Sequence, residues 1–456
     1  MMRLSEAANA IGARVVGADV PFASVSSDSR AIGAGALFVA IPGERFDGHD
    51  FVGAVRGLGA AAALVSDAAK AGTAGLPLLV VHDTKIALGR LAAFWRRRFA
   101  IPTIAIVGSN GKTTVTQMIA SILRAHFGEP QVLATTGNLN NDIGLPLMAL
   151  RLREAHRVAA LEIGMNHPGE TAWLAAIAQP TVALVNNAQR EHQEFMKSVA
   201  EVAREHAAAF ERLPADGIAV INADDDHAGY WRGIAGERRV RDFGLDQPAA
   251  VTARYRLLDF GAELAIETPE GRVEVVTSAA GLHNVRNALA AAATATAAGA
   301  SLDAVARGLA AFQAVKGRLQ KKPGRRGATL LDDTYNANPD SVIAAIDVLA
   351  RAAGDKVLVL GDMGEVGEHG PAFHEEVGRY AKARGVDFLL ATGPAMRAAA
   401  HAFGKGAEHF DDVESLVSRA ETLLTACTTA LVKGSRSMKM ERVVERLEEK
   451  DRAPCC

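Results

Sequence analysis

The sequence has few cysteines, no excess of charge of either sign and no long apolar run. Its three cysteines among 456 residues are Cys427, Cys455 and Cys456, a spacing that matches neither a disulfide framework nor a zinc site. We therefore expect reduced thiols in a reducing compartment. No stretch approaches the ~20 consecutive apolar residues of a membrane span, and the N-terminus lacks a basic segment followed by an apolar core. These absences predict a cytoplasmic protein without membrane insertion.

The charge balance argues against nucleic acid and anionic membranes as partners. The formal net charge is −2, so there is no global electrostatic attraction to nucleic acid or to an anionic membrane. Apolar residues make up 49% of the chain and charged residues 22%, as in an ordinary globular protein. The chain of 456 residues is too long for a single core, and the usual domain length of ~100–200 residues favours three domains.

Short apolar runs alternate with stretches of helical length and spacing. In the central block, strands are predicted at residues 103–107, 158–163, 181–185 and 217–221. In the last third, they are predicted at residues 329–332, 356–360, 387–391 and 430–432. This alternation is typical of mostly parallel sheets covered by helices on both faces, so the fold class is α/β. We expect domains at 1–100, 101–318 and 319–456, with the glycine- and lysine-rich segment 316–327 as a linker.

A glycine loop lies between the predicted strand at 103–107 and a predicted helix at 112–127. It consists of Gly108, Ser109, Asn110, Gly111, Lys112, Thr113 and Thr114. Backbone amides in such a loop bind phosphate oxygens, and the helix N-terminus adds partial positive charge. Lys112 would contact the β- and γ-phosphates of ATP, and Thr113 or Thr114 would offer a hydroxyl to Mg²⁺. The strict pattern has glycine where this chain has Ile106, so the loop is a shortened variant; a plain tight turn is the alternative interpretation.

Polar residues at the ends of neighbouring predicted strands narrow the chemistry. Glu162 ends one strand, and His192 and Glu194 follow the next, beyond two asparagines. Functional groups gather at this edge of a parallel sheet. Together with the phosphate loop they predict a Mg²⁺–phosphate site. A kinase, a regulatory ATPase and a ligase all remain compatible with these residues.

Several segments in order along the chain resemble the Mur ligases, the enzymes that build the peptide of bacterial cell-wall precursors. They are Gly108-Ser-Asn-Gly-Lys-Thr-Thr114, Glu162, His192, His283-Asn-Val-Arg-Asn287, Lys316-Gly-Arg318, Asp333-Thr-Tyr-Asn-Ala-Asn-Pro339, Leu360-Gly-Asp-Met-Gly-Glu365 and Leu431-Val-Lys-Gly-Ser-Arg436. The resemblance covers nearly the whole chain. It implies an N-terminal domain for the UDP-muramoyl substrate, a central ATPase-like domain with a parallel sheet, and a C-terminal Rossmann-like domain.

Within the family, the segments beginning at Asp333 and Val432 resemble the member that joins D-alanyl-D-alanine to a UDP-N-acetylmuramoyl tripeptide. That activity would consume ATP, pass through an acyl phosphate and give the pentapeptide precursor of peptidoglycan. The member that adds the third amino acid is an alternative, but its His-Thr-Pro and Asp-Asn-Pro-Arg segments are not present. A P-loop kinase or a regulatory ATPase explains neither outer domain. The implied enzyme is a monomer that does not bind nucleic acid.

The resemblance also implies residue roles. Lys112, Glu162 and His192 would be catalytic, and Thr113, Glu162 and His192 would hold the metal. The nucleotide would contact the phosphate loop together with Asn284, Asn287, Arg318 and Asp333. The substrates would contact Ser29, Arg30, Asn138, Asn141, Asp142, Asn336, Asn338, Lys433 and Arg436.

One position departs from the family pattern. Mur ligases generally carry a carbamylated lysine fourteen residues after the histidine that corresponds to His192, and its anionic oxygens serve a second Mg²⁺. The same count reaches His206 here. A neutral imidazole is a poor ligand for a cation that prefers oxygen. We therefore expect Glu205 or another nearby carboxylate to supply the oxygen, or ATP and water to hold a weaker second site.

Overall fold

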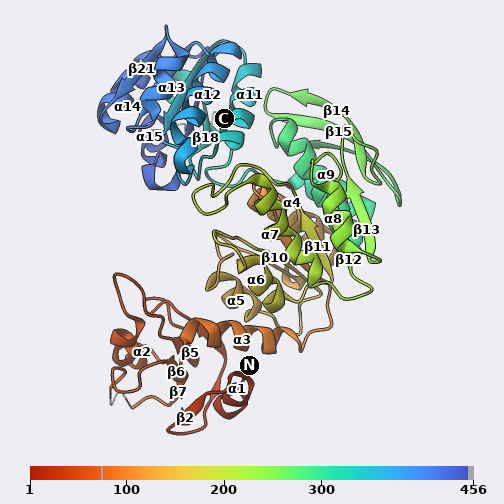
Figure 1. Ribbon diagram of the computed structural model, residues 1–456, viewed down its shortest axis with the longest axis vertical. Coiled ribbons are helices and arrows are strands. Elements are labelled where there is room, and N and C mark those ends of the chain that lie inside the picture. The colour runs from red at the N-terminus through yellow and green to blue at the C-terminus, as the bar shows by residue number, and fades with distance from the viewer. Residues whose placement is uncertain (73–74, 450–456) are drawn as a thin grey trace, which may run out of the picture.

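A computed structural model describes residues 1–72 and 75–449, so Cys455 and Cys456 lie outside the described residues. Three α/β parts follow one another along the longest axis of the molecule (Figure 1), with the N-terminal part at one end and the C-terminal part at the other. The prediction of a three-part α/β fold is confirmed. Cys427 is a free, exposed thiol. None of the helices within the described residues is long and apolar enough to cross a membrane.

The N-terminal part has a five-stranded sheet in the order β2-β7-β6-β5-β4, parallel except for β2. A short antiparallel pair, β1 and β3, lies beside it. The elements are β1 (Met2–Arg3), α1 (Leu4–Ile11), β2 (Arg14–Val16), β3 (Pro21–Phe22), β4 (Ser24–Ser26), β5 (Ala36–Val39), α2 (Val52–Gly57), β6 (Ala62–Val65), β7 (Leu78–Val80) and α3 (Thr84–Arg96). Helix α3 packs against α1 and also against α5 and α6 of the central part, so it joins the two parts.

The central part is built on a six-stranded parallel sheet in the order β13-β12-β11-β8-β10-β9. Its elements are β8 (Thr103–Val107), α4 (Lys112–Phe127), β9 (Val132–Ala134), α5 (Gly144–Ala149), β10 (Val158–Glu162), α6 (Glu170–Ala178), β11 (Val182–Val185), α7 (Val199–Glu211), β12 (Ile218–Asn222), α8 (Ala228–Ala235) and β13 (Arg239–Phe243). Alternate residues of β8 face opposite sides. Ile104 and Ile106 pack with α4, whereas Ala105 and Val107 pack in the core of α5 to α8. A fully buried strand results, which explains its continuous apolar run.

A small antiparallel sheet that the sequence analysis did not predict covers part of this domain. It consists of β14 (Thr252–Leu258), β15 (Gly261–Thr268) and β16 (Gly271–Thr277), and α9 (Leu282–Ala297) and α10 (Leu302–Ala311) follow it. On β15 the alternate residues Ala262, Leu264 and Ile266 are buried in the core that holds α4 and α9. Polar residues on the other face are typical of a sheet with one wet side. The alanines of α9 are buried along most of its length, because small side chains allow close packing.

The C-terminal part is a second sheet, in the order β17-β18-β22-β19-β20-β21, parallel except for β17. Its elements are β17 (Gln320–Pro323), β18 (Thr329–Asp333), α11 (Pro339–Arg351), β19 (Asp355–Gly361), α12 (Gly370–Ala383), β20 (Phe388–Thr392), α13 (Met396–Phe403), β21 (Ala407–Phe410), α14 (Val413–Leu423), β22 (Thr428–Lys433) and α15 (Glu441–Leu447). The segment expected to be a linker contains β17, which pairs with β18 as an edge strand. Its lysines alternate in exposure, so the basic composition concealed a strand.

Candidate active site

The phosphate loop joins β8 to α4, and the backbone conformation and close neighbours at two of its positions leave room only for glycine. Gly108 and Gly111 have φ values of 142° and 81°, which L side chains rarely adopt. A Cβ on Gly111 would lie 2.5 Å from Oδ1 of Asn287, and one on Gly108 would lie 2.9 Å from Cβ of Asn186. The loop therefore presses against the end of β11 and the first turns of α9. Its position leaves the N-terminus of α4 available to an anion.

Lys112 is folded over the loop that precedes it. Its ammonium group donates to the carbonyl of Gly108, to the carbonyl of Ser109 at 3.1 Å, and to Oε2 of Glu191 at 3.2 Å. A lysine has three donors, so all three have protein partners in this structure. A bound phosphate would have to replace some of these contacts.

Glu162, at the end of β10, is 2% exposed and only partly satisfied. Its Oε1 accepts from Nδ2 of Asn140 at 2.7 Å and from Oγ1 of Thr113 at 3.2 Å. Its Oε2 is buried with no hydrogen-bond partner in the described part of the chain. A buried carboxylate oxygen without a partner is costly unless a cation or donor reaches it. The donor set around Glu162 thus fits a divalent cation that prefers oxygen.

Next to Lys112 lies a second carboxylate that the sequence analysis missed. Glu191 is 6% exposed; its Oε1 lies 3.1 Å from Nε2 of His206, and its Oε2 lies 3.8 Å from Nε2 of His192. Burial by itself would raise the pKa of the Glu191 carboxyl, but Lys112 and the two histidines lower that pKa to about 2. Glu191 is therefore ionised. The backbone of His192 has a positive φ of 48°. Nδ1 of its ring lies 2.6 Å from Oε2 of Glu365 in the C-terminal part.

Glu205 has a different position from the one considered in the sequence analysis. Its two carboxylate oxygens accept from the backbone amides of Gly169 at 2.9 Å and Thr171 at 2.8 Å. The side chain therefore caps the start of α6, where a negative charge is favourable. Glu205 lines neither of the two cavities beside the phosphate loop, so Glu191 is the carboxylate that accompanies His206.

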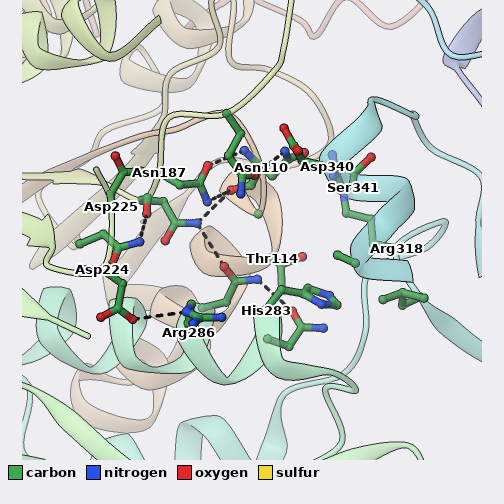
Figure 2. A pocket seen from close by; sticks show the side chains of 18 of the residues that line it. Asn110, Thr114, Asn187, Asp224, Asp225, His283, Arg286, Arg318, Asp340 and Ser341 are labelled. Atoms are coloured by element: carbon green, nitrogen blue, oxygen red, sulfur yellow. Dashed lines mark hydrogen bonds and ion pairs between the residues drawn. The ribbon is translucent and has the colours of Figure 1, made fainter. Parts of the chain in front are cut away.

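Two cavities meet at the phosphate loop. The first, of about 330 Å³, lies between the central and C-terminal parts (Figure 2), with Asp340 and Ser341 of α11 beside Asn110. The second, of about 270 Å³, is lined by Lys112, Glu162 and Glu191, among others. Both cavities share Asn110, Gly111, Arg318, Asp333, Ser341 and Lys433. A ligand with an aromatic base and a phosphate chain can therefore extend from one cavity into the other.

Amide side chains line the first cavity. Asn284 and Asn287, on α9, are joined by a bond of 2.9 Å, and Asn186 donates to Oδ1 of Asn287 at 3.1 Å. His283 also lines this cavity; burial and the charge of Lys433 lower its pKa to about 4, so the ring is neutral. Amide groups offer both donors and acceptors. Neutral groups of this kind suit the edge of a nucleotide base.

The C-terminal part completes both cavities. Arg318 donates from Nη2 to Oγ1 of Thr113 at 3.1 Å, and Asn338 donates to Oδ1 of Asn110 at 3.0 Å. Arg190, in the central part, lies 2.6 Å from Oδ1 of Asp340 on α11 and 2.7 Å from Oε2 of Glu376 on α12. We call this pair of ion pairs the Arg190 clamp. It holds the two parts together on one side of the cavities.

Sequence and structure comparisons agree with this architecture. Three segments match descriptions of known families: "Mur ligase family, catalytic domain" at residues 21–96, "Mur ligase middle domain" at 106–295, and "Mur ligase, glutamate ligase domain" at 317–436. The chain belongs to the Mur ligase family. Membership makes it an ATP-dependent ligase that forms an amide bond.

Individual Mur ligases match along nearly the whole chain. The UDP-N-acetylmuramoyl-tripeptide–D-alanyl-D-alanine ligase of Escherichia coli (strain K12) is 42% identical over 450 residues, covering 98% of each chain. The crystal structure of MurF from Acinetobacter baumannii has a TM-score of 0.90 at 33% identity, covering 97% of this chain and 98% of its own. The MurF ligase of Thermotoga maritima, solved in complex with ADP, has a TM-score of 0.81 at 26% identity, covering 93% and 96%.

Some of the residues that the Mur ligase resemblance assigns to substrates line the second cavity, and others line neither cavity. Asn141 and Asp142 line the second cavity, as do Asn336 and Asn338. Ser29, Arg30 and Asn138 line neither cavity; Arg30 belongs to the N-terminal part, where its guanidinium pairs with Asp28.

Lys433 and Arg436 differ in their surroundings. Lys433 is buried, and its ammonium lies 2.7 Å from Oδ2 of Asp333 and 2.8 Å from the carbonyl of Asn336. The side chain of Arg436 is 65% exposed and pairs with Glu441 at 3.2 Å. Of the two cations, Arg436 is the one open to an incoming carboxylate.

Some residues of the site had a signal in the sequence that was not used. Asn140 lies within the segment around Asn138 and Asn141, and Glu365 closes the motif that starts at Leu360. Asn186 directly follows a predicted strand. Glu191 precedes His192, but nothing in the local pattern shows that it would be buried beside Lys112.

Proposed function

We propose that this Mur ligase joins D-alanyl-D-alanine to a UDP-N-acetylmuramoyl tripeptide, at the expense of ATP. The observation that carries the chemistry is the phosphate loop at the junction of two cavities, with Lys112 and Glu162 inside the second one. The choice of substrates is supported by the name of the Escherichia coli relative, which is 42% identical over 98% of both chains.

The reaction has two steps. A carboxylate oxygen of the tripeptide attacks the γ-phosphorus of ATP, the bond to the β–γ bridging oxygen breaks, and an acyl phosphate and ADP result. The amine of D-alanyl-D-alanine then attacks the acyl carbon, loses a proton and displaces phosphate, leaving an amide. Negative charge gathers on oxygen in both steps, so fixed cations and aligned donors lower both barriers.

The residues of the second cavity suit the first step. Lys112 exchanges its contact with Glu191 for the γ-phosphate and neutralises it, while the N-terminus of α4 holds the phosphate chain. Glu162, Thr113 and His192 would hold Mg²⁺, directly or through water, and the ion would supply further positive charge to the phosphate oxygens. No three His, Cys, Asp or Glu side chains in residues 1–72 and 75–449 are grouped to hold a metal by themselves. Phosphate and water would complete its coordination, as is usual for Mg²⁺.

The other contacts follow from the placement of the remaining residues. Asn284 and Asn287 would face the base in the first cavity, and Arg318 and Asp333 would approach the nucleotide from the linker and the C-terminal part. The remaining candidates divide between the two other substrates. Ser29, Arg30, Asn138, Asn141 and Asp142 would serve the UDP-muramoyl peptide, and Asn336, Asn338, Lys433 and Arg436 would serve the dipeptide.

The enzyme is proposed to act as a cytoplasmic monomer. Residues of one chain form both cavities, so the proposed chemistry does not require a second copy. ATP and a nucleotide-activated sugar are substrates of the cytoplasm. Size-exclusion chromatography with light scattering would measure the oligomeric state, and a stable dimer would contradict this part of the proposal.

The test incubates the enzyme with ATP, Mg²⁺, D-alanyl-D-alanine and UDP-muramoyl tripeptides that end in lysine or in a diamino acid. Mass spectrometry should show the pentapeptide, and phosphate should appear only when both acceptor and amine are present. A phosphorylated acceptor as end product would instead identify a kinase. Phosphate release without either substrate would identify a regulatory ATPase.

A further inference from the structure

Glu191 is a buried carboxylate inside the second cavity without an assigned role. The residue is 6% exposed, and its two carboxylate oxygens contact Lys112 and His206. In this structure its charge is balanced by Lys112 at 3.2 Å. It lines the same cavity as Glu162, whose buried Oε2 has no hydrogen-bond partner among the residues that the structure describes. Two buried carboxylates and one lysine therefore face the place proposed for the phosphates.

His206 fixes the orientation of Glu191. The ring is 1% exposed; Nε2 lies 3.1 Å from Oε1 of Glu191, and Nδ1 has no hydrogen-bond partner among the described residues. A ring nitrogen without an acceptor is best left unprotonated when buried, so Nε2 carries the hydrogen and donates it. Oε1 is thereby held, and Oε2 is left toward Lys112 and His192.

Binding of ATP changes this charge balance. All three donors of Lys112 are already used, so in the proposed mechanism Lys112 exchanges its contact with Glu191 for one with the phosphates. Glu191 would then be a buried charge without its partner, facing phosphate oxygens of the same sign, which is strongly unfavourable. A cation between Oε2 and the phosphates removes both problems.

Nε2 of His192 is placed to be a second protein ligand of such a cation. Nε2 of His192 lies 3.8 Å from Oε2 of Glu191, while adjacent ligands of one Mg²⁺ ion at ~2.1 Å stand about 3 Å apart. A small rotation of either side chain brings both atoms to one ion. The other ring nitrogen of His192, Nδ1, lies 2.6 Å from Oε2 of Glu365. An oxygen of Glu191, a nitrogen of His192 and oxygens of the nucleotide form a donor set that binds Mg²⁺ or Mn²⁺.

We propose that Glu191 supplies an anionic oxygen, together with His192, to a divalent cation that bridges it to the ATP phosphates, and that His206 is the positioning residue for this oxygen. The inference rests on the proposed function, because it assumes that a nucleotide and its cation occupy the second cavity. It assigns Glu191, which is distinct from Glu162, to the second, nucleotide-dependent cation, and Nε2 of His192 then contacts the first ion only through water.

The test measures Mn²⁺ binding by electron paramagnetic resonance, with the non-hydrolysable β,γ-methylene analogue of ATP. The parent enzyme should bind a second Mn²⁺ only with the analogue, and Glu191→Gln should weaken that ion by about tenfold or more. Glu211→Gln, at the exposed end of α7, is the matched control and should bind as the parent does. Unchanged Mn²⁺ binding by Glu191→Gln would overturn the proposal and leave Glu191 as a counter-ion of Lys112.

Two further variants separate the roles. His206→Ala should weaken the same ion, and His206→Gln, whose amide can still donate to Glu191, should restore part of the affinity; equal binding in both would overturn the positioning role. If Glu191→Gln melts far below the parent, Glu191→Asp is used to test the proposal instead. Aspartate keeps the negative charge, but its shorter side chain moves the carboxylate oxygen away from the cation. Undiminished Mn²⁺ affinity in Glu191→Asp would then refute the proposal. The product assay is read independently, so absent pentapeptide with intact Mn²⁺ binding would reject the proposed function alone.

Discussion

Replacing Lys433 by methionine breaks the buried ion pair between Lys433 and Asp333, which lie at the ends of β22 and β18. The Lys433 and Asp333 side chains are 4% and 12% exposed, and their charged atoms lie 2.7 Å apart. Methionine preserves most of the length and apolar stem but removes the charge, so Asp333 is left buried without its cation. Breaking a buried pair in this way costs about 3–5 kcal/mol. We expect the C-terminal part to lose stability by that amount near neutral pH.

The loss should depend on pH, with a sign that the structure determines. Burial already raises the pKa of Asp333, even though Lys433 and Arg318 oppose the rise. In Lys433→Met the pKa rises further. An acid with a raised pKa in the folded state stabilises that state when protonated, so the penalty is smallest below the unfolded value of ~3.9. It grows as the pH increases through the folded pKa of Asp333.

Hydrogen exchange read by mass spectrometry can follow this part of the chain alone. The three tryptophans, Trp95, Trp173 and Trp231, all lie outside the C-terminal part, so their fluorescence is a poor probe. Peptides of β18 and β22 should lose protection by about two to three orders of magnitude at neutral pH and by much less near pH 4.

Two controls accompany this measurement. Lys405→Met removes an exposed lysine and should leave protection unchanged, and the double variant Lys433→Met, Asp333→Asn should recover much of the loss. Parent-like protection at neutral pH in Lys433→Met, or a loss equal at both pH values, would refute the reasoning.

Four other changes test the site. Lys112→Ala should lower ligation by about 10²-fold or more, and should also lower the melting temperature, because Glu191 loses its ion-pair partner; near-parent activity would remove the loop from the mechanism. Arg190→Ala should weaken the ligand-induced compaction measured by solution scattering, because the clamp joins two domains; the same compaction in both enzymes would count against the clamp. Arg436→Ala should raise KM for D-alanyl-D-alanine far more than for ATP, whereas equal changes would indicate a loop anchor. Activity should not depend on bicarbonate, and His206→Ala should lose less activity than Glu162→Ala; a bicarbonate requirement would show that a carbamate is formed after all.

The elements that are specified by residues close together in the sequence could be predicted from it. The strand at residues 103–107 and the helix at 112–127 occur with the predicted bounds, because the apolar run, the glycines and the helical spacing are local signals. Most strands of both large sheets were placed within a residue or two, since buried parallel strands read as continuous apolar runs. The gathering of Glu162 and the phosphate loop also followed, because the strand ends of a parallel sheet share one edge.

The tertiary structure decided which charges face one another. Lys112 and Glu191 are 79 residues apart, and Lys433 and Asp333 are 100 apart; no local pattern states that each pair is buried together. Likewise, β14 to β16 each keep one face exposed, so their apolar residues are too sparse for the buried-strand signal used elsewhere. The sequence by itself determined most strands of the two large sheets and the phosphate loop. Burial and long-range pairing, which set the cost and the use of each charge, exist only once the three parts are packed.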